Sequence, residues 1–373
     1  MGKQLRRWQI EAIACFKVVA GSLLAISFLC SCFSIALGQT YEATPSHVSP
    51  PSLNAPSVTI RNGQITAKVY RSDNREGDFY RSTRFDQTGI VGELTLGREK
   101  IYGGAWFDLV SPEIHDVSFT PAGIIVNPNT AIMGPVEEYD PVGFDVASSG
   151  GTFLKIGVGL LRRPDDEKYD HTRHYEIVDA GKRATHVASN AVTFIQDVDD
   201  AEHGYHYEKT LRLVPGKPQM IIDHLLKNTG TKTIQTTVYD HNFLSLSPGN
   251  GDVAITLPFA PMPNRPTQNE LARIDANRIV YVKPLVDEER VSFRIAGFGN
   301  EVRDYDIRAE NTVTGVGMRV TADQPLVRLS LWSIRSVLGI EPYIGIDLPS
   351  GASKRWTYTY DFIAPNHKPT GTK

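Results

Sequence analysis

The run KTIQTTVYDHNFLSL (residues 232–246) joins β-branched and aromatic residues to three consecutive polar ones, Asp240, His241 and Asn242. Residues of the first two kinds favour strands, so the run predicts a strand. Successive side chains of a strand point to opposite faces, which places His241 on the face opposite to Asp240 and Asn242. Each buried polar group needs a hydrogen-bond partner. His241 is therefore either a core histidine with satisfied neighbours or part of a functional site.

Similar short runs recur along the chain between Gly, Pro, Asn and Asp residues, and several alternate with period 2, as half-buried antiparallel strands do. Helical patterns are almost absent, and residues 267–282 are the best candidate for a short helix. No repeat of fixed period is present. We predict one all-β domain over residues 58–366, built from large curved antiparallel sheets. The short strand-like runs that support this prediction include SVTIRNGQITAKVY (57–70), HVASNAVTFIQDV (186–198), YHYEKTLRLV (205–214), QMIIDHLLKN (219–228), LVRLSLWSI (326–334) and RWTYTYDFIA (355–364).

The N-terminus has the pattern of an export signal. Basic residues precede the apolar run at 18–38, and small residues lie before Gln39. We expect a signal peptide over residues 1–38, a Pro- and Ser-rich linker over 39–57 and a disordered tail over 367–373. The protein is then periplasmic or extracellular. An uncleaved membrane anchor through residues 18–37, or a lipid on Cys32, is the alternative.

The composition of the chain limits the classes of molecule that it is expected to bind. The chain of 373 residues has a formal net charge of -3 and is 41% hydrophobic, which is ordinary for a globular protein. We expect no nucleic-acid partner and, beyond the leader, no membrane partner, because no basic stripe is present. All three cysteines lie in the predicted leader. The mature chain then has no disulfide, thiolate zinc site or cysteine nucleophile.

Three further stretches and one glutamate hold polar residues that a β-sheet core does not need. Clustered carboxylates can bind a cation or share a proton, and an arginine fork can bind sugar hydroxyls or a carboxylate. Glu341 lies among apolar residues, where a carboxylate has a raised pKa that suits a general base. Exposed loops and strand ends remain the alternative for each. The stretches hold Arg81, Arg84 and Asp86; Glu137, Glu138 and Asp140; and His171, Arg173 and His174.

Two of these segments resemble the galactose mutarotase (aldose 1-epimerase) superfamily. YDHNFLSL (239–246) is similar to its NHxYFNL strand. GIEPYIGIDLPSGASKRWTYTYDF (339–362) is similar to its C-terminal segment, in which a glutamate precedes a proline and a Y.F strand follows. RSTRFDQTG (81–89) lies where mutarotases carry an NRI arginine. The resemblance spans nearly the whole mature chain.

The resemblance implies a galactose mutarotase-like β-supersandwich that acts on a sugar or oligosaccharide without a cofactor or a metal. It implies that His241 is the general acid, Glu341 the general base and Arg84 the sugar-binding arginine. Asn242 is expected to bind substrate beside His241. Aromatic residues such as Trp106, Tyr239 and Trp332 are candidate sugar platforms.

One family histidine, expected within residues 133–145, is missing here. Glu137 or Glu138 could substitute for it, or His174 could reach in from a neighbouring loop. This departure leaves two other readings open. One is a non-catalytic carbohydrate-binding protein. The other is a polysaccharide lyase, or a hydrolase in which Glu341 would pair with Glu137 or Glu138.

Overall fold

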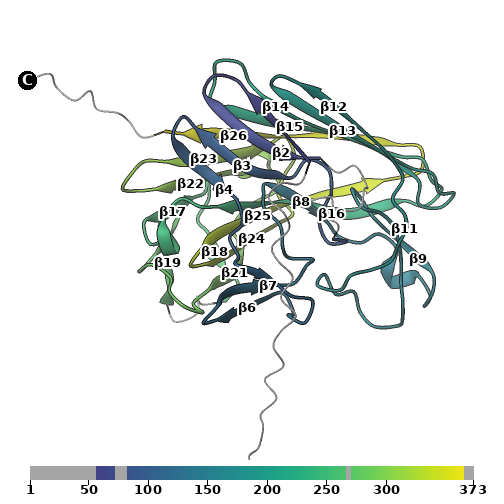
Figure 1. Cartoon of the computed structure of the whole chain (residues 1–373), viewed down its shortest axis with the longest axis horizontal. Coiled ribbons are helices and arrows are strands. Elements are labelled where there is room, and N and C mark those ends of the chain that lie inside the picture. The colour runs from purple at the N-terminus through teal and green to yellow at the C-terminus, as the bar shows by residue number, and fades with distance from the viewer. Residues whose placement is uncertain (1–55, 72–81, 266–269, 365–373) are drawn as a thin grey trace, which may run out of the picture. The chain divides into compact units, whose positions relative to one another are not determined.

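The computed structural model describes residues 56–71, 82–265 and 270–364. The predicted leader, most of the predicted linker, Arg81 and the predicted tail lie outside the described residues. The regular secondary structure of the described part is almost wholly antiparallel β-strand, so the all-β prediction is confirmed (Figure 1). Within these residues, no helix has the length and apolar character needed to cross a membrane.

The largest sheet has ten strands and contains the long neighbouring strands β14, β15 and β26. Its order is β12 (Lys182–Ala188), β13 (Ala191–Val198), β14 (Tyr205–Leu213), β15 (Gln219–Asn228), β26 (Ser353–Ile363), β23 (Gly317–Ala322), β22 (Asp306–Asn311), β17 (Val253–Thr256), β20 (Arg278–Tyr281) and β19 (Ala272–Asp275).

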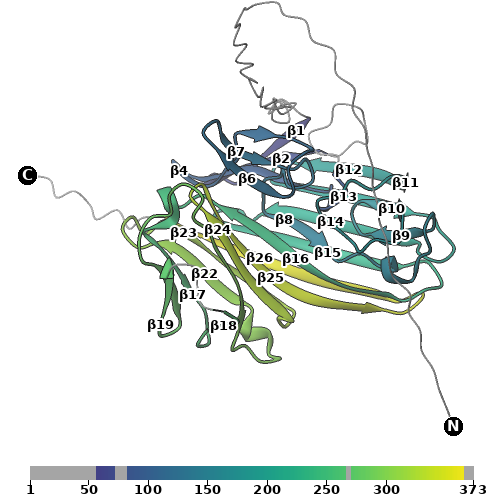
Figure 2. The ribbon, with the colours of Figure 1, turned by 90° about the horizontal axis from the view of Figure 1, so that it is seen from below.

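A six-stranded sheet carries both polar segments that the resemblance singles out, on its neighbouring strands β16 and β25. Its order is β18 (Met262–Pro263), β21 (Val291–Ala296), β24 (Arg328–Ile334), β25 (Val337–Leu348), β16 (Ile234–Leu244) and β8 (Val136–Tyr139). Figure 2 shows β8, β16 and β25 lying along one another.

Three smaller sheets and three short 3₁₀ helices complete the described part. The sheets are β1 (Ser57–Arg61), β2 (Ile65–Tyr70), β3 (Val91–Leu96) and β4 (Glu99–Gly103); β11 (Ile177–Asp179), β10 (Gly159–Arg162) and β9 (Thr152–Lys155); and β5 (Leu109–Val110), β7 (Gly123–Val126) and β6 (Val117–Thr120). The helices are η1 (Phe144–Val146), η2 (Pro248–Asn250) and η4 (Val302–Asp304).

The main core lies between the two large sheets, and strict alternation along the strands produces it. On β14, every second residue from Tyr205 to Leu213 is buried. The buried face of β26 contributes Trp356, Tyr358 and Tyr360 to the same cluster as Val238 of β16 and Ile344 of β25. Burial of aromatic side chains of this size stabilises a core strongly.

The strand β16 is buried on both faces from Val238 to Leu244. One face packs into the core between the large sheets. The other belongs to a second cluster that includes Trp106, Phe107 and Phe243. Consecutive polar residues on β16 therefore lie in two different environments, which explains how the strand accommodates three of them.

The prediction of a short helix over residues 267–282 is wrong for the part that is described. Strands β19 and β20 form a hairpin there, with Asp275 paired to Arg278. Ala276 has a φ of 56°, in the left-handed region, and Asn277 donates from Nδ2 to the carbonyl oxygen of Leu257 at 2.6 Å. A tight turn with a side-chain anchor has replaced the helical turns that the pattern suggested.

Candidate active site

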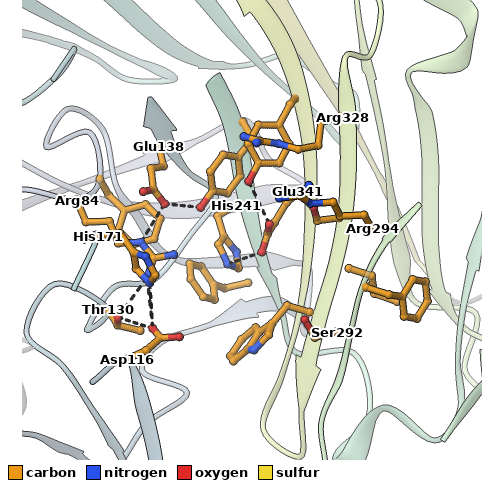
Figure 3. Close-up of a pocket in the computed structure, with 18 of the residues that line it drawn as sticks. Arg84, Asp116, Thr130, Glu138, His171, His241, Ser292, Arg294, Arg328 and Glu341 are labelled. Atoms are coloured by element: carbon orange, nitrogen blue, oxygen red, sulfur yellow. Dashed lines mark hydrogen bonds and ion pairs between the residues drawn. The ribbon is translucent and has the colours of Figure 1, made fainter. Parts of the chain in front are cut away.

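A cavity of about 590 Å³ opens on the face of the six-stranded sheet that is turned away from the main core. Strands β8, β16, β25, β24 and β21 form its base, and loops around residues 84, 116, 130 and 171 form its opposite wall (Figure 3). Its polar lining residues include Arg84, Asp116, Thr130, Glu138, Asp140, His171, Tyr239, His241, Asn264, Arg265, Ser292, Arg294, Arg328, Ser330, Glu341 and Tyr343.

His241 and Glu341 meet at the base of this cavity. The pairs Tyr239–Tyr343 and Asn242–Ile340 fix the register of β16 and β25 on either side of them. His241 Nε2 lies 3.4 Å from Glu341 Oε1, and the side chains are 5% and 15% exposed. Two groups that can exchange a proton therefore face the cavity together.

Aromatic rings fix the orientation of the His241 imidazole. The ring stacks on Phe243 with 3.7 Å between centroids and 3° between planes, and Trp332 meets it edge-on at 6.2 Å. On the next strand, a Cβ on Gly339 would come within 2.5 Å of His241 Cε1. Only glycine leaves room for the imidazole at that point.

The surroundings move the pKa values of this pair in opposite directions. Burial, and then the positive charge of Arg84, lower the pKa of His241 to about 3. Burial raises the pKa of Glu341 to about 7, although Arg84 acts in the other direction. Near pH 6 the pair therefore holds one ionisable proton, on Glu341, and His241 is neutral.

Arg84 is anchored on the opposite wall. Its Nε donates to Glu138 Oε2 at 2.9 Å, and its Nη1 donates to Thr130 Oγ1 at 3.2 Å and to Asp116 Oδ1 at 3.4 Å. Burial would raise the pKa of Glu138, but the charges of Arg84 and Lys155 outweigh it and lower the pKa to about 2. Glu138 is thus ionised, and Tyr239 Oη also donates to it.

Three of the predicted site residues come together in the cavity: His241, Glu341 and Arg84. The prediction of Glu137 as a sugar-binding residue is wrong, because alternate side chains of β8 point to opposite faces. Glu138 lines the cavity, whereas Glu137 is fully buried towards the main core and contacts Lys209 and His224.

The prediction that Asn242 binds substrate is also wrong. Asn242 points away from the cavity into the core, where its Oδ1 accepts a hydrogen bond from Tyr102 Oη at 3.1 Å and its Nδ2 donates to the carbonyl oxygen of Asp240 at 2.9 Å. His174 is exposed and does not line the cavity; His171, three residues earlier, does. The loop between these histidines turns the first one inward.

Sequence reasoning missed four charged residues of the cavity, Asp116, Arg265, Arg294 and Arg328, and the tyrosine beside Glu341, Tyr343. Arg328 lies over the Tyr343 ring at 3.6 Å from its centroid, and Tyr343 Oη donates to Glu341 Oε2 at 3.3 Å. The period-2 pattern of residues 291–296 puts Ser292 and Arg294 on one face, but only the pairing of β21 with β24 shows which face.

No group of three or more His, Cys, Asp or Glu side chains is placed to hold a metal ion within residues 56–71, 82–265 and 270–364. The contact between His241 and Glu341 makes proton transfer between this pair and a bound molecule the candidate chemistry of the cavity.

Neither a family model nor a curated protein matches the chain, so the comparison rests on solved structures. A protein assigned as an aldose 1-epimerase from Klebsiella pneumoniae superposes with a TM-score of 0.50 and 12% identity, over 86% of this chain and 91% of that one.

Two other solved structures give lower scores. An aldose epimerase homologue from C. elegans has a TM-score of 0.47 and 13% identity over 84% of this chain and all of that one. A galactose mutarotase-like protein from Lactobacillus casei has a TM-score of 0.47 and 14% identity over 82% of this chain and 99% of that one. At these identities the likeness concerns the fold. The chain is a galactose mutarotase-like β-supersandwich, as its sequence resemblance implied.

Proposed function

We propose that this protein is an exported carbohydrate epimerase that interconverts the anomers of an aldose by acid–base catalysis with His241 and Glu341. The observation that carries the proposal is the contact of these two side chains at the base of an open cavity. Two titratable groups with pKa values of about 3 and 7 lie 3.4 Å apart there. Pairs whose pKa values are pushed apart in this way are typical of acid–base sites.

The reaction needs one proton taken and one proton given. The group that lacks a proton removes the hydrogen from the anomeric hydroxyl O1, while its partner protonates the ring oxygen O5. The C1–O5 bond then breaks and C1–O1 becomes a carbonyl. Rotation about C1–C2 and the reverse steps close the other anomer. The pair holds one ionisable proton throughout, which is the state that its pKa values favour near pH 6.

The resemblance assigns the acid role to His241 and the base role to Glu341. These roles require the proton to pass from Glu341 to His241 across their contact before O1 is deprotonated. The opposite assignment needs no such transfer. Both assignments use the same two groups and the same number of protons, so the proposal does not depend on the choice.

The rest of the cavity suits a sugar. Trp106 and Trp332 lie in edge contact at 5.4 Å between centroids, and they provide an apolar surface beside the acid–base pair. Glu138 lines the cavity and holds Arg84 at its edge, which supports the expectation that it substitutes for the missing family histidine. Export is supported by the signal-like pattern of residues 1–38.

The test is anomer exchange, measured by saturation-transfer NMR across a panel of aldoses and uronic acids. The wild-type protein should accelerate exchange beyond the buffer rate, and His241→Ala and Glu341→Gln should remove the acceleration. His186→Ala and Glu93→Gln change exposed residues of the same types on β12 and β3 and serve as matched controls. Saturable sugar binding without faster exchange would instead identify a non-catalytic carbohydrate-binding protein.

A further inference from the structure

The charges of the cavity are unevenly compensated. On the loop wall, Arg84 is paired with Glu138 and Asp116. At the opposite side, Arg265 and Arg294 have no carboxylate partner within the described residues. Arg265 donates from Nε and Nη2 to the carbonyl oxygen of Ser292, at 3.0 and 2.7 Å.

The backbone N–H of Arg294 donates to Asn264 Oδ1 at 2.8 Å, whereas its guanidinium has no hydrogen-bond or ion-pair partner within the described residues and is exposed at the cavity. Figure 3 shows Arg294 and Ser292 on the Glu341 side of the cavity, with Arg84 and Glu138 on the other. An arginine that lines a cavity without a partner is free to bind an anionic group of a ligand.

Strand pairing sets the spacing of Arg294 from the acid–base pair. Arg294 of β21 pairs with Ser330 of β24, and Ser330 pairs with Glu341 of β25. The three residues therefore form one row across the sheet, and each step between strands is about 5 Å. His241 lies next to Glu341 on the following strand. The row runs from the acid–base pair past a serine hydroxyl to an uncompensated guanidinium.

A sugar that reacts at this pair must present a particular edge to the row. The acid has to reach the ring oxygen, and in a hexopyranose the carbon bonded to that oxygen on the side away from C1 carries C6. A substituent at C6 therefore lies close to the reacting edge. With that edge at Glu341, C6 can project over Ser330 towards Arg294.

The charge count favours one negative charge on that substituent. Four arginines and four carboxyl groups line the cavity. Since the Glu341 carboxyl group has its pKa raised to about 7, it is mostly neutral under mildly acidic conditions. Among the arginines and carboxyl groups the lining then has one excess positive charge, and this excess lies on the side of Arg265 and Arg294.

We infer that the sugar taken by this site is a uronic acid, with its C6 carboxylate bound by Arg294 and its anomeric centre at Glu341 and His241. This inference deepens the proposed function and names its substrate class. Arg265 adds positive charge beside the carboxylate, and the hydroxyl of Ser330 faces the ring. A guanidinium binds a carboxylate through two parallel hydrogen bonds, which gives orientation as well as affinity.

Calorimetric titration at pH 6 tests the inference, with D-glucuronate, D-galacturonate, the matching neutral hexoses and glucose 6-phosphate as probes. We expect each uronate to bind about ten-fold or more tightly than its neutral hexose, because a charged hydrogen bond is worth about that factor. Arg294→Gln should lower the ratio of the two affinities by about ten-fold. Arg308→Gln changes an exposed arginine of β22 that pairs with Glu310, and it should keep the ratio.

Equal affinities for uronates and hexoses, or a preference that survives Arg294→Gln, would overturn the inference. Tighter binding of glucose 6-phosphate that Arg294→Gln removes would also overturn it, in favour of a phosphorylated sugar. The titration does not depend on turnover. If anomer exchange is never accelerated but the uronate preference holds and requires Arg294, the proposed catalysis fails and the uronate site stands.

Discussion

A glutamate of strand β8 lies near a histidine on each face of that strand, but only one of the two faces adjoins a cavity. On the core face, Glu137 lies between Lys209 and His224, and all three side chains are almost wholly buried. On the cavity face, Glu138 holds Arg84, and His241 faces Glu341 beside a volume of about 590 Å³. Both faces place a glutamate and a histidine among aromatic rings.

The difference shows that buried charge alone does not mark a functional site. On the core face, the partners of Glu137 belong to the protein and are held by neighbouring strands. On the cavity face, the His241–Glu341 pair remains open to a ligand on one side. A shifted pKa points to function only where a cavity adjoins the shifted group.

The largest expected contrast is between the two histidines. His241→Asn should lower the rate of anomer exchange by about 10²–10⁴-fold, the usual contribution of a general acid or base. His224→Asn should act mainly on stability, because His224 contacts Glu137 at 2.5 Å inside the core. Exchange rates and urea unfolding of both variants measure this. An active His241→Asn variant would remove the distinction between the two faces.

The neighbouring glutamates of β8 sharpen the same contrast in stability. Glu137→Gln leaves the buried Lys209 without its main counter-charge, and such a loss costs about 3–5 kcal/mol of unfolding free energy. Glu138→Gln should cost less, about 1.5–3 kcal/mol, because Arg84 keeps Asp116 and Thr130. Equilibrium unfolding in urea separates the two. A larger loss for Glu138→Gln would reverse the assignment of the structural face.

Glu341→Gln should stabilise the protein while it removes activity. The pKa of Glu341 is about 7 in the folded protein and near 4.5 when unfolded. The free energy of unfolding therefore decreases as pH rises between these values, because the buried carboxyl group must ionise in the folded state. The full loss is present above pH 7. The gain from Glu341→Gln should be about 2 kcal/mol larger at pH 8 than at pH 5. Thermal unfolding at both pH values, with Glu93→Gln alongside, checks this; an equal gain would contradict it.

An effect is also expected in the pH profile of kcat/KM. The pair holds one ionisable proton between the pKa values of His241 and Glu341, about 3 and 7. The rate should be flat from pH 5 to about 6.5 and then fall towards ten-fold per pH unit above 7. Saturation transfer across pH 5–9 gives the profile. A rate that rises through pH 7 would instead make ionised Glu341 with neutral His241 the working form.

The strands and the contact between His241 and Glu341 could be anticipated from sequence, for different reasons. Alternation in segments such as YHYEKTLRLV reflects a two-sided environment, so it predicts β14 directly. The pairing of His241 with Glu341 came from a resemblance, since the two are 100 residues apart in the chain. The choice between Glu137 and Glu138 depends on a register with β16 that places Glu138 opposite Tyr239. No pattern in the sequence around β8 tells which of the two glutamates faces the cavity.

Arg294 illustrates the remaining limit. Its place near Glu341 depends on two successive strand pairings, β21 with β24 and β24 with β25. The sequence around residue 294 does not indicate with which strand β21 pairs. His171 and His174 differ for another reason, because they lie in an irregular loop where no period tells which side chain turns inward.

The position of β8 has a consequence for association between molecules. β8 is the edge strand of the six-stranded sheet, and the backbone N–H of Asp86 donates to the carbonyl oxygen of Glu137 at 2.8 Å. The segment that brings Arg84 to the cavity thus also hydrogen-bonds to a backbone carbonyl of the edge strand β8. A free edge of this kind can pair with a strand from another chain. Substitutions that displace this segment, for example to admit larger substrates, would free the β8 edge and favour aggregation through strand pairing.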